Sequence, residues 1–463
     1  MKKTYLGALL FAGTLAFTAC QNETVVYVDE NGNPVENAGL QEGEGLLEIA
    51  VSSTDVASRA ARPVGSSAAA NNVSEVKVYA FKEVDGTYKF DNTLSLSNQL
   101  EGVSGGEGIF TVTGLEPVAD HAYISMEGHT DQTKILTLKG LVKGAKYKFV
   151  AVGYNDTYPY GTLPTPETIN ENTALTDFIQ TAELGSSSSS GTVGVPGIGD
   201  VEELFAGVSE EYETQADKAV FTRKASVTIT RQVAGMLGYF EKVPTTIGGE
   251  VVRYVKVYAN AITFTFKFPA QLLGTPDFNG VNSSEAEIPV MEFDMAVIAT
   301  NWNDGTPTGN TYTFADCSTT GLNAGAEAST SAPLATGYHA PQGLKLKQGS
   351  IFGGRYLIPY SGHFDSQTLT VTLESPDRKT LKTLNVVTDQ IPANASKNAY
   401  DIRCNNFYSI GQKLDTDSTD GGTPDDPDPD PDEDKPIDLS GNTDIVVIVN
   451  DAWKVLHNMG VEE

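Results

Sequence analysis

The end of the chain constrains the fold most strongly. Five consecutive apolar side chains, all branched at Cβ, stand at Ile445, Val446, Val447, Ile448 and Val449. Such a run fits a pleated, buried surface, and no polar residue marks a face that could meet water. The run therefore predicts a β-strand that must pair with a sheet to bury its side chains.

The segment before this strand, residues 415–436, cannot contribute to a hydrophobic core. It holds ten carboxylates and five prolines, and its single basic residue is Lys435. Charge repulsion and proline keep such a segment extended, at about 3.1 Å per residue, so it could span up to ~70 Å. That reach allows the terminal strand to enter another molecule. The alternative is that the strand folds back as the last strand of its own domain.

The composition favours an all-β chain with more than one domain. A length of 463 residues is too great for one small core, and the 45 glycines, 19 tyrosines and 19 phenylalanines accompany many short alternating segments. The formal net charge of −29 and the lack of a basic stripe argue against nucleic acid as a partner and against an anionic membrane surface.

The N-terminus has the features of a lipoprotein signal peptide. Lys2 and Lys3 precede an apolar stretch, residues 5–17, that is too short to span a bilayer. The signal peptide ends in TLAFTAC, residues 14–20. A small residue directly before Cys20 resembles the bacterial lipobox, in which the cysteine is lipidated and becomes the new N-terminus. The alternative is an ordinary cleavage site with an incidental cysteine.

The segment 45–52, GLLEIAVS, alternates apolar and other residues and predicts a half-buried strand. Leu47, Ile49 and Val51 share one face of that strand. Because the residues before it are polar, we expect residues 21–59 to form a tether and a removable segment that carries this strand.

A loop of small residues, 53–72, follows the strand and carries two arginines. Such loops are preferred sites of proteolysis, so a trypsin-like enzyme is expected to cut after Arg59 and leave Ala60 as the new N-terminus. Arg62 is the alternative site, although Pro63 follows it and hinders productive binding to a protease.

Short alternating segments recur through the rest of the chain at the spacing of β-sandwiches. They predict two tandem domains with a boundary near residue 215. The expected organisation is a signal peptide at 1–20, the tether and removable strand at 21–59, an N-terminal β-sandwich at 60–215, a C-terminal β-sandwich at 216–414, an acidic linker at 415–443 and the terminal strand at 444–463.

The motifs that suggest chemistry are weak. GVSGG at 102–106 matches the GxSxG hydrolase elbow, but the strand-like GIFTVTG that follows it favours a hairpin. DTDSTDGG at 415–422 has one residue too many for a calcium loop, and the five histidines lack ligand spacing. Cys317 and Cys404 either pair or remain two buried thiols. We expect no enzyme, no metal and no cofactor.

The order of several short motifs resembles the fimbrillins, the pilins of Bacteroidia type V pili. The lipoprotein start and the strand with its arginine-bearing loop come first. The later motifs are VSEVKVYAF at 73–81, YKFVAVGYN at 147–155, ELFAG at 203–207, TRQVAG at 230–235, YDIRCNNFYSIGQKL at 400–414 and IVVIVNDAW at 445–453.

The resemblance implies a lipoprotein precursor with two β-sandwich domains of transthyretin-like or Greek-key type, carried to the outer membrane. An arginine-specific protease would remove the first strand, and the C-terminal strand of the next subunit would fill the vacated groove. The product would be a head-to-tail polymer on the cell surface that supports adhesion. Two other functions compete with this one: a monomeric surface lipoprotein that binds glycans through exposed aromatic residues, and a secreted hydrolase.

Overall fold

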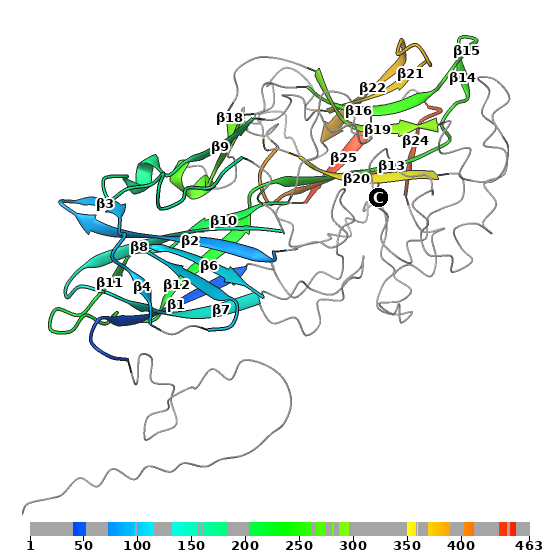
Figure 1. The fold of residues 1–463 in the computed structure, drawn as a ribbon. Helices are drawn as coiled ribbons and strands as arrows, with labels where there is room; N and C mark the ends of the chain where they lie inside the picture. The colour runs from blue at the N-terminus through cyan, green and yellow to red at the C-terminus, as the bar shows by residue number, and fades with distance from the viewer. Residues whose placement is uncertain are drawn as a thin grey trace, which may run out of the picture.

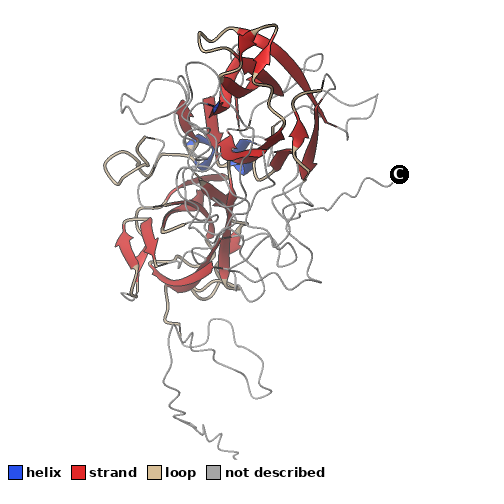
Figure 2. Cartoon of the chain, turned by 90° about the vertical axis from the view of Figure 1, so that its right-hand side faces the viewer, coloured by secondary structure: helices blue, strands red, loops and turns tan. Residues whose placement is uncertain are grey.

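The computed structural model describes a chain built almost entirely of β-strands (Figures 1 and 2). The described residues are 40–51, 73–97, 100–114, 132–155, 158, 161–183, 203–260, 265–273, 280–281, 287–295, 350–357, 359, 369–388, 402–411, 435–441 and 445–450. Within these ranges the helical elements whose bounds are described are two short 3-10 helices, η1 (Leu175–Asp177) and η2 (Ala270–Leu273). The all-β prediction is confirmed.

The first sheet holds eleven strands in the order β4-β7-β1-β12-β10-β8-β2-β6-β5, with β11 beside β8 and β3 beside β2. Side chains from both ends of this order belong to one buried cluster, so the sheet curls over a core of its own. Its strands are β1 (Glu44–Val51), β2 (Glu75–Val84), β3 (Thr87–Phe90), β4 (Ser95–Leu96), β5 (Val103–Gly106), β6 (Ile109–Thr113), β7 (Gln132–Lys139), β8 (Lys146–Tyr154), β10 (Phe205–Val208), β11 (Tyr212–Glu213) and β12 (Ala225–Arg231).

The second sheet holds nine strands in the order β19-β16-β21-β22-β25-β23-β13-β20, with β24 beside β13. These strands are β13 (Ala234–Glu241), β16 (Tyr254–Asn260), β19 (Glu287–Asp294), β20 (Ser350–Leu357), β21 (Leu369–Glu374), β22 (Thr380–Thr388), β23 (Phe407–Ile410), β24 (Ile437–Asp438) and β25 (Ile445–Asn450). Two small sheets complete the described strands, one of β14 (Thr246–Ile247) and β15 (Glu250–Val251), and one of β18 (Gly280–Val281), β17 (Thr265–Phe268) and β9 (Gln180–Glu183).

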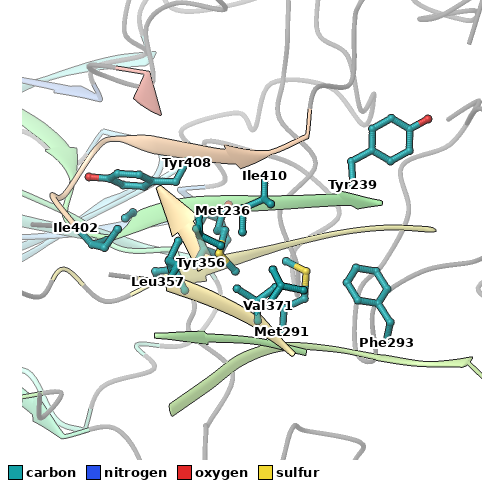
Figure 3. Close-up of a cluster of buried hydrophobic side chains, with 14 of the residues drawn as sticks. Met236, Tyr239, Met291, Phe293, Tyr356, Leu357, Val371, Ile402, Tyr408 and Ile410 are labelled. Carbon is teal, nitrogen blue, oxygen red and sulfur yellow. The ribbon is translucent and has the colours of Figure 1, made fainter. Parts of the chain in front are cut away.

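The core of the second sheet is rich in aromatic and sulfur-containing side chains (Figure 3). Tyr239 and Phe352 meet edge to face with ring centroids 5.4 Å apart, and Phe240 meets Phe293 at 5.6 Å. Such pairs add about 0.5 to 1.5 kcal/mol each beyond the area that they bury. The core of the second sheet also includes Val152 and Tyr154 of β8 and Ala206 of β10, so it is continuous with side chains of the first sheet.

The chain passes from one sheet to the other between β12 and β13, at residues 232–233. The boundary predicted near residue 215 lies N-terminal to this passage, because β12 belongs to the first sheet. Alternation along residues 225–231 indicates a strand with one buried face. It does not indicate which core that face joins, and here it joins the core that also contains β1.

The terminal run forms β25 inside the second sheet of its own chain. The strand is parallel to β22, from Val386↔Ile445 to Thr388↔Val447, and antiparallel to β23, from Phe407↔Asn450 to Ile410↔Val447. This arrangement is the alternative raised from the sequence, and it corrects the expectation of a strand separated from both sandwiches. Residues 415–434 of the acidic segment lie outside the described residues.

Candidate functional site

Strand β1 fills a groove in the middle of the first sheet. On one side it is antiparallel to β7 along its whole length, from Glu44↔Lys139 to Val51↔Gln132. On the other side it is parallel to β12, from Leu47↔Ala225 to Val51↔Ile229. Without β1, both neighbours would present unpaired backbone groups, and the sheet would be open on two facing edges.

The inward side chains of β1 are fully packed. Leu47 and Ile49 are 0% exposed and Val51 is 1% exposed, and all three belong to the core of the first sheet. Full burial of such a side chain contributes roughly 1.5 to 3 kcal/mol, so the three together are comparable to a large part of a domain's net stability. A strand that replaced β1 would gain stability from apolar side chains at these alternate positions.

Two carboxylates fix the outer side of β1. Glu48 pairs with Lys224 at 2.5 Å. The Ser97 hydroxyl and the Gln41 amide donate hydrogen bonds to the Glu44 carboxylate, the latter at 2.9 Å. The bond from Ser97 is the main reason that the pKa of Glu44 lies below its ordinary value of 4.5. The groove thus recognises charge as well as apolar shape.

The entrance of the groove is narrow at Gly45. A Cβ atom at this position would lie 2.6 Å from Leu141 Cδ1 and 2.6 Å from Phe221 Cδ2. Phe221 is held edge to face against Tyr147 and Phe149, with ring centroids 5.8 and 6.2 Å away. Because Phe221 has little room to withdraw, glycine is the residue that fits between these two side chains.

The motifs that carry the resemblance meet at the junction of the two sheets. Glu203 from ELFAG and Arg231 from TRQVAG form an ion pair of 2.5 Å in which both side chains are 2% exposed. Gln232 donates to the Ala206 carbonyl at 3.1 Å and accepts from the Ala270 amide at 2.9 Å. The backbone amide of Asn405, in the motif YDIRCNNFYSIGQKL, donates a hydrogen bond to the Val233 carbonyl at 2.9 Å.

The sequence of these motifs does not show that they lie together, so this junction was not predicted. The sequence signal for the junction is that Glu203 and Arg231 each stand beside apolar strand residues, whose pattern predicts burial. A buried charge needs a partner, and these two are of opposite sign.

Several predicted sites lie outside the described residues, including the lipidation site Cys20 and the processing residues Arg59, Ala60 and Arg62. The five histidines and Cys317 also lie outside them, whereas Cys404 is buried. The terminal residues 445–450 are described as strand β25, which lies in a different sheet from β1.

The GVSGG motif forms a hairpin, since β5 pairs with β6 from Val103↔Val112 to Gly106↔Ile109. Ser104 therefore lies on a strand and not on a turn from strand to helix. In the part of the chain that the structure describes, no group of His, Cys, Asp and Glu is arranged to hold a metal ion. No described helix is long and apolar enough to cross a membrane.

The chain is similar to several solved structures of fimbrial proteins. It is similar to a fimbrilin from Porphyromonas gingivalis W83, with 12% identity over 88% of this chain and 97% of the other and a TM-score of 0.37. It is also similar to the fimbrial anchor protein Mfa2 from Porphyromonas gingivalis, with 11% identity, 79% and 89% coverage and a TM-score of 0.32. A fimbrial assembly protein from Parabacteroides distasonis matches with 11% identity, 81% and 93% coverage and a TM-score of 0.28.

No family model and no curated protein matches the sequence. Each of the three likenesses to a solved structure is at 11 to 12% identity and has a TM-score below 0.4. We therefore argue function from this chain's own strands and contacts.

Proposed function

We propose that this chain is a structural subunit of a surface fimbria, and that it assembles by exchange of strands between subunits. The observation that carries the proposal is the position of β1. This strand completes the first sheet on both sides, yet it is joined to the rest of the chain through residues 52–72, which contain Arg59 and Arg62. A cut in that segment would leave a removable strand in a groove lined by β7 and β12.

A strand is a suitable ligand for the emptied groove. It would satisfy the backbone groups of β7 and β12 and fill the pockets of Leu47, Ile49 and Val51. Each inward apolar side chain would contribute roughly 1.5 to 3 kcal/mol, reduced by the cost of ordering the strand. The joint between two subunits should therefore be long-lived.

The terminal strand, residues 445–450, has neighbours that run in the same relative directions as those of the groove. In its own sheet β25 has one parallel neighbour, β22, and one antiparallel neighbour, β23. The groove of β1 offers the same pair of relationships, with β12 parallel and β7 antiparallel. We infer that β25 is kept in its own sheet before assembly, and that it leaves this sheet to enter the groove of the next subunit.

The export and processing steps follow from the sequence. Lipidation at Cys20 would carry the precursor to the outer membrane, and an arginine-specific protease would cut after Arg59, or after Arg62 as the second choice. The partners are then further copies of this chain or related pilins. The resulting polymer would lie at the cell surface and support adhesion.

The alternative of a monomeric glycan-binding lipoprotein gains no support from the described surface. The large hydrophobic side chains exposed there are Val84, Leu100 and Val142, and none of them is aromatic. Aromatic platforms are the usual means by which a protein surface meets a sugar ring.

N-terminal sequencing of the surface-exposed protein tests the proposal. The fimbrial role predicts a mature chain that begins at Ala60 in the wild type, and an Arg59→Ala variant that remains an uncut monomer. A wild-type chain that keeps a blocked Cys20 on the surface would favour the monomeric lipoprotein. If Arg59→Ala assembles normally, either Arg62 is the site of cutting or cleavage does not trigger assembly.

A further inference from the structure

We propose that the C-terminal strand enters the groove in one fixed register, with Gly441 in the position of Gly45, Ile445 in that of Ile49 and Val447 in that of Val51. The inference rests on the proposed strand exchange and goes beyond it, because it states which residue of the incoming strand meets each part of the groove.

The first support is the narrow point of the groove. Leu141 and Phe221 leave no room for a Cβ atom at the position of Gly45, so the incoming strand should place a glycine there. Between residues 437 and 459 the chain has one glycine, Gly441. Gly441 is therefore the candidate for this position.

The second support is the spacing of the residues that follow. Residues 45–51 read GLLEIAV and residues 441–447 read GNTDIVV. With the two glycines aligned, the fourth position is acidic in both segments, the fifth is isoleucine and the seventh is valine. The segment before and within β25 thus repeats the pattern G-x-x-(D/E)-I-x-V of the strand that it would replace.

The third support is the charge at the outer side of the groove. Glu48 pairs with Lys224 at 2.5 Å in the intact chain, and removal of β1 would leave Lys224 without this carboxylate. In the proposed register Asp444 takes the place of Glu48. The ion pair would then form again between two subunits, with a side chain one methylene shorter.

Other registers fit the groove less well. A shift by two residues, with Ile445 at Leu47, would place Thr443 between Leu141 and Phe221. A shift by one residue would place Asn442 or Ser440 at the same point. Each of these residues brings a Cβ atom that the space does not accept. The proposed register does place Thr443 in the pocket of Leu47, which makes that pocket the weakest part of the match.

Disulfide trapping in the full-length chain tests the register. Ala50 lies opposite Thr133 of β7, whose side chain is exposed, so the proposed register puts Val446 opposite Thr133 of the next subunit. Directly opposite residues of antiparallel strands have Cβ atoms about 4.5 to 5.5 Å apart, which is near disulfide range, whereas a shift of two residues adds about 7 Å. The test variant is Thr133→Cys with Val446→Cys, and the matched controls are Thr133→Cys with Ile448→Cys and Thr133→Cys with Asp444→Cys.

After proteolytic activation and mild oxidation, the test variant should give covalent dimers and larger multimers, and both controls should give at least tenfold fewer. Preferential linkage in either control would overturn the register while leaving strand exchange intact. Absence of any detergent-resistant multimer before oxidation, in wild type as well as variants, would instead count against strand exchange itself.

A second comparison does not depend on disulfide geometry. Gly441→Val should abolish multimers because it places a side chain at the narrow point. Asn442→Val should preserve them, because in the proposed register its side chain would point to the other side of the inserted strand. Equal assembly of both variants would contradict the role of Gly441, provided that both precursors show the melting temperature of the wild type.

Discussion

The carboxylate of Glu203 and the guanidinium of Arg231 form a buried ion pair of 2.5 Å at the point where the chain leaves the first sheet for the second. Arg231 is the last residue of β12, and its guanidinium also lies 5.1 Å from the centre of the Phe205 ring. The pair ties the strand before the junction to the segment that enters β10. The junction is thus held by charge within an apolar setting.

Arg231→Ala should be strongly destabilising, because it removes the guanidinium that pairs with the buried Glu203 carboxylate at 2.5 Å. The expected loss is about 3 to 5 kcal/mol in the free energy of unfolding. Chemical denaturation monitored by circular dichroism measures it. The matched control is Arg223→Ala, which removes an ion pair with Glu210 whose side chains are 57% and 75% exposed and should change stability by less than about 1 kcal/mol. Equal losses in the two variants would contradict the role of the buried pair.

Deletion of residues 444–463 should lower the stability of the second sheet. The deletion removes β25 from between β22 and β23 and exposes both edges, so the second sheet should melt at least several degrees earlier. Differential scanning calorimetry of the uncut precursor is the measurement. If the melting curve does not change, β25 is not an integral strand of its own sheet.

Gly45→Val should destabilise the precursor by about 1 to 3 kcal/mol, because its side chain must displace Leu141 or Phe221. The control is Gly106→Val, at a strand position where an added Cβ meets nothing within 4 Å. Thermal unfolding of the two variants gives the comparison. A Gly45→Val precursor as stable as the control would show that the groove can widen.

The contact between Asp438 of β24 and Lys242 should weaken at low pH. Asp438 of β24 accepts hydrogen bonds from Lys242 at 2.8 Å and from the Ser440 hydroxyl at 2.6 Å, and these lower its pKa from the ordinary 3.8 to about 2. A lowered carboxyl pKa stabilises the folded state above the ordinary value, and this contribution is lost as the pH falls from about 4 to about 2.

The protection of the amides in residues 437–440, which is the intrinsic exchange rate at each pH divided by the measured rate, should therefore fall over that range of pH. The Asp438→Asn variant should show reduced protection already at neutral pH and little further change in protection between pH 4 and 2. Unchanged wild-type protection across the range would contradict the role of the Asp438–Lys242 pair.

The sequence predicted the strands better than their partners. Alternation at Leu47, Ile49 and Val51 indicated β1 because a half-buried strand repeats every two residues. The uniform run at 445–449 indicated a strand for a different reason, because consecutive apolar residues branched at Cβ fit a buried, pleated surface. The spacing of apolar residues along one strand does not indicate which distant strand pairs with it. The insertion of β25 between β22 and β23 and the place of β12 in the first sheet could therefore not be predicted.

The candidate site was predicted in part. The removable strand was proposed from its own residues, but Leu141, Phe221 and Lys224 come from loops and strands far along the chain. Their meeting around Gly45 and Glu48 depends on tertiary packing. In the same way, Glu203 and Arg231 are 28 residues apart and become partners only when β10 and β12 pair.

The most direct measurement of strand exchange is the ladder of detergent-resistant multimers that protease-treated subunits give on an unboiled gel. Val447→Asp should abolish this ladder when it is the sole subunit, because a carboxylate in the inserted strand would be desolvated at a cost of several kcal/mol. Its groove is unchanged, so it should still accept the terminal strand of wild-type subunits and shorten their ladder when the two are mixed. A Val447→Asp ladder equal to that of the wild type would contradict the account.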